Sequence, residues 1–349
     1  MAKEIIDELN DKGEVIGQID KDLAHKEGRL HKAIHLWILN KKNEVLLQYR
    51  CKDKKLYPDT WDVSVGGHVS AGEDTKTACL REAKEELGIE IKEKDLEYIT
   101  TLREELLYED INSQELVDVF MIRKDVKLKD IKLQEEEVGS VKYVTVNELF
   151  ELIDTNQLLP HGEEFNIIKN ILTEIVIKNN IRTIKDYPIE GVNFRDITTL
   201  LKDGEAYKLA INSMIDIVKN MDVDVIVGPE ARGIMFAAPV AYGLGKGYVP
   251  VRKPKKLPAE VISQSYDLEY GTDSLEIHKD AIKKGQKVVI IDDLMATGGT
   301  MGAIVKLVER LGGKVVKIIC MVDLPELGGK DKFKEYDYSY IVKYMEDEK

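Results

Sequence analysis

The apolar residues divide the chain into two regions with different patterns. Beyond about residue 205, stretches with helical spacing alternate with short runs of branched apolar residues, namely VDVIVG, GYVPV, KVVIIDD and VVKIICMVD. These runs have the length of strands and lack a strict two-residue alternation, which is typical of parallel strands covered on both faces. The alternation of helices and strands predicts βαβ units and a mainly parallel sheet.

The first region has a mixed pattern. Between His31 and Val65, short apolar runs alternate with turn residues; a helical stretch follows, and then the strand-like runs ELVDVFMIR and VKYVTV. This order predicts an α+β unit with a mixed sheet. The segment GEEFNIIKNILTEIVIKNN, residues 162–180, predicts a helix that joins the two regions. We therefore expect an α/β protein with one domain at residues 1–165 and a second at 166–349.

Length and composition agree with two folded domains. The 349 residues exceed the usual size of one domain, and an apolar content of 43% is enough for two cores. Cys51, Cys79 and Cys320 lack the C-x-x-C spacing of a zinc site or disulfide framework, which indicates a reducing compartment. No apolar run approaches the roughly 20 residues of a membrane span. A net charge of −13 disfavours nucleic-acid binding. Taken together, these observations lead us to expect a cytoplasmic protein that binds neither nucleic acid nor membranes.

A motif rich in glycine and glutamate covers residues 66–90, GGHVSAGEDTKTACLREAKEELGIE. Glu82, Glu85 and Glu86 follow i, i+3, i+4 spacing, so a helix would place three carboxylates on one face. Like charges repel unless a cation lies among them, and oxygen donors favour Mg²⁺, with Mn²⁺ as the alternative ion. Such an ion can bind a diphosphate and activate the water that attacks phosphorus. A solvated acidic helix face is the alternative interpretation, and the complete spacing with its glycines disfavours it.

The motif meets every fixed position of the Nudix box, and the resemblance to Nudix hydrolases covers roughly residues 30–160. It implies an α/β/α sandwich that hydrolyses a nucleoside diphosphate linked to another moiety. By this resemblance, Arg81 orients the glutamates, and Glu86 or a carboxylate outside the box is the catalytic base. The metal ligands that the resemblance implies are Glu82, Glu85 and Glu86, together with the carbonyl of Gly67.

The preceding segment, YPDTWDVSVGGHV, also resembles the isopentenyl-diphosphate isomerase branch of the same superfamily. Ser64 and Val65 stand where that branch has its active-site cysteine. Isomerisation is therefore the weaker alternative. His68 and His278 are interpreted as structural or solvent-facing.

A second motif, VVIIDDLMATGGT at residues 288–300, joins a buried strand to a loop of small residues. Ligands of open α/β sheets bind outside the carboxyl ends of the strands, and a turn of small residues before a helix offers backbone N–H groups to a phosphate. Asp292 and Asp293 would repel that phosphate, so they suit hydroxyl groups beside it. The motif predicts a site for a ribose 5-phosphate, and another kind of phosphate turn or a plain strand end are the alternatives.

This motif resembles the phosphoribosyl-diphosphate signature of type I phosphoribosyltransferases. Four further segments narrow the resemblance to the adenine phosphoribosyltransferases: residues 186–201, 227–242, 251–258 and 265–282. Together they cover about residues 170–349 and imply a mainly parallel sheet, a homodimer and a reaction that uses Mg²⁺. The implied reaction joins adenine to 5-phosphoribosyl 1-diphosphate, giving AMP and pyrophosphate.

The resemblance also implies roles for single residues. Glu269 would stabilise the positive charge that develops on the ribose in the transition state, and Tyr270 would lie beside it in a mobile lid. The adenine ring is expected near Asn193 and Arg195; Asn193 departs from the apolar residue often found there. The residues implied to bind phosphoribosyl diphosphate are Asp292, Asp293, Ala296, Thr297, Gly298, Gly299, Thr300, Glu230, Ala231, Arg232, Arg252, Lys253 and Lys256.

Two alternatives do not require both reactions. A purine-responsive regulator would bind the same ligands without turnover, but it should lack Glu269 and carry a basic DNA-binding element, which the sequence does not show. A Nudix half that only senses nucleotides is disfavoured by the intact set of glutamates. The preferred interpretation is a bifunctional enzyme with adenine, phosphoribosyl diphosphate and a nucleoside diphosphate conjugate as its substrates.

Overall fold

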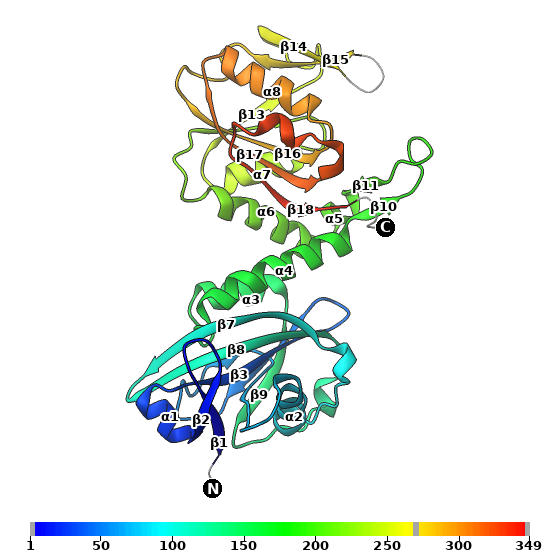
Figure 1. The fold of residues 1–349 in the computed structure, drawn as a ribbon. Helices are drawn as coiled ribbons and strands as arrows, with labels where there is room; N and C mark the ends of the chain where they lie inside the picture. Colours follow the sequence, from blue (N-terminus) through cyan, green and yellow to red (C-terminus); the bar gives the residue numbers. More distant parts are fainter. Residues whose placement is uncertain (1–3, 268–271, 346–349) are drawn as a thin grey trace. The chain divides into compact units, whose positions relative to one another are not determined.

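The computed structural model describes residues 4–267 and 272–345 (Figure 1). The chain divides into two compact units, Met1–Leu172 and Thr173–Lys349. Helix α4 (Gly162–Asn180) covers the residues predicted as a joining helix and contains the point of division. No helix in the described part of the chain is both long enough and apolar enough to cross a membrane.

The N-terminal unit contains the predicted mixed sheet. Strands β3 (Leu30–Leu39) and β8 (Ile111–Arg123) pair in parallel at its centre, and the other pairings are antiparallel. The path runs β5-β4-β3-β8-β7, with β6 beside β3 and β9 beside β4. The remaining strands of the sheet are β4 (Val45–Arg50), β5 (Trp61–Asp62), β6 (Val65–His68), β7 (Glu97–Tyr108) and β9 (Val138–Val144).

Helix α2 (Thr75–Leu87) covers part of this sheet because one of its faces is apolar. Ala83 and Leu87 are buried in one core cluster with Ile34 of β3 and Phe120 of β8. A hairpin and short helices complete the unit: β1 (Ile5–Leu9), β2 (Val15–Asp20), α1 (Lys21–Glu27), α3 (Val146–Asp154) and the 3₁₀ turns η1 (Glu93–Asp95) and η2 (Leu128–Asp130).

The C-terminal unit contains the predicted parallel sheet, in the order β13-β12-β16-β17-β18. Its central strand β16 (Lys287–Met295) is buried along most of its length, as its unbroken apolar run predicts. The other strands are β12 (Val225–Pro229), β13 (Gly247–Val251), β17 (Lys314–Asp323) and β18 (Tyr338–Lys343); the helices are α5 (Thr198–Lys202), α6 (Gly204–Val218), α7 (Ile234–Gly243) and α8 (Gly299–Arg310), with η3 (Pro325–Leu327) and η4 (Lys330–Phe333).

Two antiparallel ribbons lie outside this sheet. Strands β10 (Arg182–Ile184) and β11 (Phe194–Asp196) form the first, and β14 (Val261–Asp267) and β15 (Thr272–His278) form the second. The second ribbon includes residues 265–267 and 272–278 of the segment 265–282, in which the sequence shows no strong period. Leu275 and Ile277 are buried in the core and give β15 a two-residue alternation within that segment.

Candidate functional site

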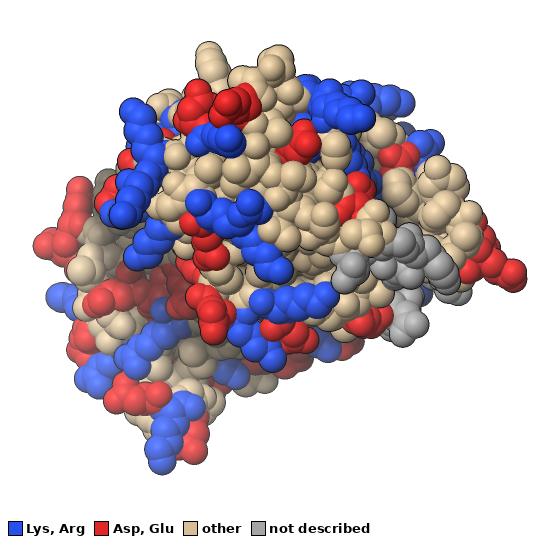
Figure 2. All heavy atoms as spheres, turned by 90° about the horizontal axis from the view of Figure 1, so that it is seen from above, with Lys and Arg blue, Asp and Glu red and all other residues tan. Residues whose placement is uncertain are grey.

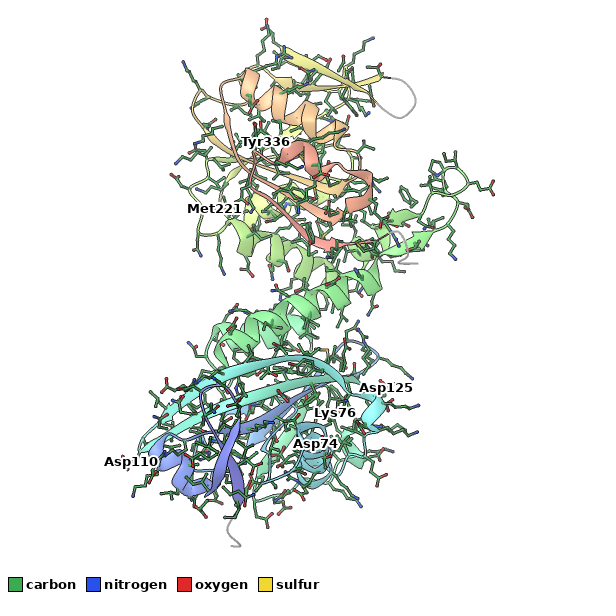
Figure 3. The ribbon with its side chains drawn as sticks, in the orientation of Figure 1. Asp74, Lys76, Asp110, Asp125, Met221 and Tyr336 are labelled. Carbon is green, nitrogen blue, oxygen red and sulfur yellow. The ribbon has the colours of Figure 1, made fainter. Side chains whose placement is uncertain are left out.

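Helix α2 presents the Nudix-box glutamates, and local interactions define both of its ends. Asp74 lies just before the helix, and its carboxylate accepts a hydrogen bond from the backbone N–H of Thr77 at 3.1 Å (Figure 3). Gly88 ends the helix with a φ of 67°, in the left-handed region that glycine favours. Because the buried face fixes the rotation of the helix, the glutamates face the adjoining cavity.

Arg81 connects the carboxylates of this motif. Its Nη1 donates to Glu82 at 2.7 Å and to Glu85 at 3.0 Å, while Nε and Nη2 donate to Glu73 at 3.1 and 3.0 Å. Nη2 also donates to the backbone carbonyl of His68 at 3.0 Å. One guanidinium therefore orients two of the three glutamates predicted as metal ligands, which is the arrangement that the role implied for Arg81 requires.

Gly67 lies directly against Glu82. A Cβ atom at Gly67 would lie 2.3 Å from Cδ of Glu82, which is too close for any other residue to be accommodated without movement. The backbone carbonyl predicted as a further ligand therefore belongs to a segment in contact with the glutamate set.

The Glu86 carboxyl is buried and has one oxygen available to bind a cation. It is 3% exposed, and among the described residues its Oε2 atom has no hydrogen-bond partner. Burial raises the pKa of Glu86 to about 8, and burial also raises the pKa of Glu82. The three glutamates thus offer oxygen donors, one of them buried and unsatisfied, and this set fits a hard divalent cation.

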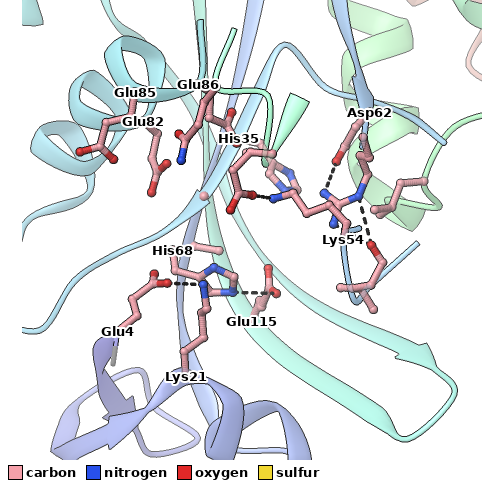
Figure 4. Close-up of a pocket in the computed structure, with 18 of the residues that line it drawn as sticks. Glu4, Lys21, His35, Lys54, Asp62, His68, Glu82, Glu85, Glu86 and Glu115 are labelled. Carbon is pink, nitrogen blue, oxygen red and sulfur yellow. Dashed lines mark hydrogen bonds and ion pairs between the residues drawn. The ribbon is translucent and has the colours of Figure 1, made fainter. Parts of the chain in front are cut away.

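These residues line a cavity of about 400 Å³ (Figure 4). The lining includes side chains that the sequence interpretation missed because they lie outside the box: Arg50, Lys54, Asp62, Glu115 and His161. Arg50 donates to Asp62 at 2.9 Å, and Nε2 of His161 lies 2.8 Å from the other oxygen of the same carboxylate. The cavity therefore has glutamates on one side and cationic groups elsewhere in its wall, which suits a charged phosphate ligand with a metal ion.

His161 lies between two carboxylates of the cavity region. Its Nδ1 is 3.1 Å from Glu104, opposite the contact of Nε2 with Asp62. Burial lowers the pKa of His161, but the carboxylates of Glu104 and Asp62 raise this pKa well above its ordinary value. The imidazole is thus held as a cation, and both ring nitrogens are used in this ion-pair network.

In the C-terminal unit, most residues predicted to bind phosphoribosyl diphosphate come together at one edge of the sheet. Strands β12 and β16 are parallel neighbours, so the loops after them meet there. They enclose a cavity of about 250 Å³. Its lining includes Glu230, Ala231, Arg232, Asp292, Asp293, Ala296, Thr297, Gly298, Gly299 and Thr300.

The two aspartates of this cavity differ in their contacts. Nε of Arg232 lies 2.8 Å from Oδ2 of Asp293, whereas Oδ1 of Asp292 accepts a hydrogen bond from the backbone N–H of Asp293 at 2.8 Å. Burial raises the pKa of both carboxyls, and the neighbouring Asp293 adds to the shift at Asp292. Arg232 therefore balances one of two closely spaced charges before any ligand binds.

The loop before α8 is shaped by glycines. Gly298 has a φ of 79° and directly precedes the helix. Gly329, from a later part of the chain, packs so closely that a Cβ atom on it would lie 2.2 Å from the carbonyl oxygen of Ala296. The sequence motif does not include Gly329, and its contact could not be inferred from spacing.

The segment 251–258, which carries the predicted ligands Arg252, Lys253 and Lys256, lies beside this cavity and does not line it. Glu230 accepts hydrogen bonds from Nε of Arg252 at 2.7 Å and from the backbone N–H of Lys253 at 2.6 Å. Lys253 also forms an ion pair with Asp273 of β15, and Lys256 is exposed. Thus Glu230 connects the cavity wall to the cations predicted to bind pyrophosphate, while the three cations do not converge on the loop cavity.

The predicted adenine residues have different surroundings. Asn193 is exposed, whereas Arg195 is buried, with its guanidinium 3.9 Å from the ring centre of Tyr344 and Nη1 donating to Thr183 at 2.5 Å. Neither lines the loop cavity. Between them, Phe194 has its ring 5.2 Å from the guanidinium of Arg232, so this aromatic residue approaches the cavity wall. Glu269 and Tyr270 lie outside the described residues.

Charged side chains of both signs are spread over the face of the molecule that Figure 2 shows. Its described Lys and Arg side chains alternate with Asp and Glu side chains over the surface (Figure 2). A continuous basic surface of the kind that neutralises nucleic-acid phosphates is not seen on this face.

Comparison with known proteins identifies two domains. Residues 29–162 match the NUDIX domain family, and residues 197–347 match the phosphoribosyl transferase domain family. Adenine phosphoribosyltransferases of Clostridium botulinum (strain Eklund 17B / Type B) and Clostridium acetobutylicum are 55% and 54% identical to this chain over 168 residues, which are 48% of this chain and 98% of each relative.

Solved structures of the same enzyme also match the C-terminal half. That of Thermoanaerobacter pseudethanolicus is 54% identical, covering 48% of this chain and 98% of its own, with a TM-score of 0.47. That of Saccharomyces cerevisiae is 32% identical, covering 49% of this chain and 98% of its own, also with a TM-score of 0.47. The chain belongs to the adenine phosphoribosyltransferase family through its C-terminal half, and residues 29–162 of its N-terminal half match the NUDIX domain family.

Proposed function

We propose that the protein is a bifunctional enzyme whose C-terminal unit transfers the phosphoribosyl group to adenine, releasing pyrophosphate and forming AMP. The observation that carries this proposal is the loop cavity, where Asp292, Asp293 and Arg232 meet the glycine-rich turn before α8. Backbone N–H groups of residues 296–300 would bind the 5-phosphate, and the aspartates would hold the ribose hydroxyls. The identity to adenine phosphoribosyltransferases supports adenine as the base.

The remaining transferase residues would stabilise the charges that develop as the bond between ribose and pyrophosphate breaks. Arg252, Lys253 and Lys256, with the loop of Glu230, would bind the pyrophosphate group and stabilise its negative charge as it leaves. Glu269 would stabilise the opposite charge on the ribose. Mg²⁺, when bound to the diphosphate, supplies further neutralisation of the leaving group. Asn193 would give the adenine pocket a polar wall, which we expect to weaken base binding.

The Nudix unit is proposed to hydrolyse a nucleoside diphosphate conjugate. Glu82, Glu85 and Glu86 would hold Mg²⁺, with Mn²⁺ as the alternative ion, and the metal supplies activation of the attacking water when bound. Arg50 and Lys54 in the same cavity would bind the phosphates. Glu86 would accept a proton from the water. An adenine-containing conjugate such as ADP-ribose is the proposed substrate, because it releases AMP, the product of the other unit.

Product analysis of the full chain tests both activities. Transfer is measured by incubating phosphoribosyl diphosphate with adenine, hypoxanthine, guanine or orotate; we expect AMP to form fastest. Faster use of hypoxanthine would refute the base assignment. Absence of turnover with every base would instead favour the regulator.

Hydrolysis is measured in parallel with ADP-ribose, dinucleoside polyphosphates, oxidised nucleoside triphosphates and isopentenyl diphosphate. Glu86→Gln should abolish hydrolysis and spare transfer, whereas Asp293→Asn should impair transfer and spare hydrolysis. This matched pair shows whether the two sites are independent. Isomerisation of the prenyl substrate, or no hydrolysis of any conjugate, would overturn the hydrolase assignment.

A homodimer formed through the C-terminal unit is also part of the proposal. On α7, the apolar side chains of Met235 and Tyr242 are 45% and 89% exposed, and burial of such groups stabilises association. Sedimentation of the wild type and of a Met235→Glu, Tyr242→Glu variant tests this. A monomeric wild type would contradict it.

A further inference from the structure

The basic segment 251–258 is attached to the β14–β15 ribbon as well as to Glu230. Arg252 and Glu276 of β15 exchange two backbone hydrogen bonds, at 2.9 and 2.7 Å. The backbone N–H of Lys255 also donates to the carboxylate of Glu276 at 2.9 Å. The segment therefore pairs with β15 as a short antiparallel strand would, and this pairing determines which side chains of the ribbon its cations meet.

Two side chains of the ribbon hold the ammonium group of Lys253. This group forms an ion pair with Asp273 of β15. It also lies 6.0 Å from the ring centre of Tyr266 on β14, at the distance of a cation–π interaction. Tyr266 and Asp273 are opposite one another in the register of the two strands. One cross-strand pair thus presents a carboxylate and an aromatic face to the same lysine.

The carboxylate of Asp273 is oriented by its neighbours, but it is open to solvent. Its Oδ1 accepts a hydrogen bond from the backbone N–H of Ser274 at 2.7 Å, and its Oδ2 accepts one from the hydroxyl of Tyr266 at 3.4 Å. The side chains of Asp273 and Lys253 are 28% and 43% exposed. Water screens an ion pair of this kind, so its strength is modest. The lysine can therefore exchange this carboxylate for another anion at small cost.

Lys253 is close to the loop cavity through its backbone only. The described residues that line the cavity are 229–232 and 292–301, and Lys253 is not one of them. Its backbone N–H nevertheless donates at 2.6 Å to Glu230, which belongs to that lining. A lysine side chain is long and flexible, so rotation about its bonds can move the ammonium from the ribbon towards a ligand in the cavity.

A diphosphate group and Asp273 would compete for this ammonium. The competition rests on the proposed transferase function, in which Lys253 binds the pyrophosphate group. A diphosphate carries more negative charge than one carboxylate and attracts the ammonium more strongly. Binding of the ligand must nevertheless replace the contact with Asp273, and the strength of that contact is subtracted from the affinity. Release of pyrophosphate restores the contact, so the carboxylate favours release by the same amount.

We propose that Asp273 is a positioning residue of the transferase, which holds the Lys253 ammonium on the ribbon and yields it to the diphosphate group of the substrate. The exchange moves one side chain and changes no covalent bond. Asp273 thereby weakens the binding of phosphoribosyl diphosphate and of pyrophosphate by the same factor. A carboxylate that only stabilised the ribbon would have the opposite effect, because its loss would disturb the pairing with the basic segment.

The test compares Asp273→Asn with the wild type, using the full chain. Calorimetric titration with pyrophosphate in excess Mg²⁺ gives a Kd, and initial rates of AMP formation give the KM for phosphoribosyl diphosphate. Both constants should fall about two-fold to five-fold, which is the range expected for loss of a competing exposed ion pair. Asp273→Glu retains the charge and should stay close to the wild type. Misfolding cannot raise affinity, so a tighter complex cannot come from a damaged variant.

A double-mutant cycle shows whether Asp273 acts through the lysine. Lys253→Met should raise both constants, and the double variant should match Lys253→Met alone, because the carboxylate then has no ammonium to hold. The matched control is Glu260→Gln, which removes one negative charge beside the same ribbon. Glu260 is paired with Lys279 at 3.0 Å, away from the basic segment, and its replacement should leave both constants unchanged.

The outcomes separate this proposal from the function on which it rests. Unchanged constants in Lys253→Met would refute the pyrophosphate-binding role of Lys253 and the competition with it. If Lys253→Met weakens binding, unchanged or weaker binding in Asp273→Asn would refute the positioning role alone. An equal gain in Glu260→Gln, or a gain from Asp273→Asn that persists without the lysine, would assign the effect to overall charge and would also refute it.

Discussion

Glu86→Gln should change how the stability of the N-terminal unit depends on pH. The folded-state pKa of Glu86 is about 8, compared with an ordinary value of 4.5, because the carboxyl is buried. The metal-free folded unit therefore binds this proton more tightly than the unfolded chain does. The resulting stabilisation is fully present below pH 4.5 and is lost as the pH rises through about 8. Glutamine has the shape of the protonated acid but cannot ionise, so the variant should lack this loss.

The size of the effect follows from proton linkage. While the folded unit holds the proton and the unfolded chain does not, stability falls by about 1.4 kcal/mol for each pH unit. Between pH 6 and pH 8 the wild type should therefore lose about 2 kcal/mol more than Glu86→Gln. Above pH 9 both proteins should change in parallel. Other titrating groups contribute to both curves and are removed when one is subtracted from the other.

Tryptophan fluorescence isolates this unit, since Trp37 and Trp61 are the two tryptophans of the chain. Urea unfolding is followed from pH 6 to pH 9 in the presence of a chelator. Glu85→Gln is the matched control, because it makes the same substitution one residue away at a side chain that is 53% exposed. Parallel curves for the wild type and Glu86→Gln would refute the conclusion that Glu86 is buried as a neutral acid.

Four further substitutions test the two sites. Gly67→Ala should reduce hydrolysis at least about 100-fold while sparing transfer, because its Cβ would lie 2.3 Å from Cδ of Glu82; release of AMP from ADP-ribose measures it, and unchanged hydrolysis would contradict the contact. Gly329→Ala should raise the KM for phosphoribosyl diphosphate, since its Cβ would displace the carbonyl of Ala296 at 2.2 Å; initial rates across substrate concentrations decide this, with hydrolysis as the control. Glu269→Gln should lower kcat about 100-fold to 1000-fold with little change in KM, and an unchanged kcat would remove Glu269 from the reaction. Asn193→Val should lower the KM for adenine several-fold in the same assay, and a higher KM would show that the amide helps to bind the base.

The sequence alone determined the features that depend on neighbouring residues. Glu82, Glu85 and Glu86 lie within five positions, so the pitch of one helix is enough to place them together. Asp292, Asp293 and the loop after them are contiguous in the same way. The apolar runs also revealed the parallel sheet of the C-terminal unit, because burial on both faces requires an unbroken apolar strand. These signals are local, and the structure contains each of the corresponding elements.

Tertiary structure decided which distant segments meet. His31 and Glu115 lie far apart in the sequence, and the parallel pairing of β3 with β8 places them opposite one another in register. The contact of Gly329 with Ala296 similarly depends on how the chain returns after β17. Strand order and register are set by the packing of the whole core, which no local periodicity specifies. For that reason the sequence predicted the three glutamates of α2 as a group. The proximity of His25, His31, His68 and Glu115 could be recognised only in the folded chain.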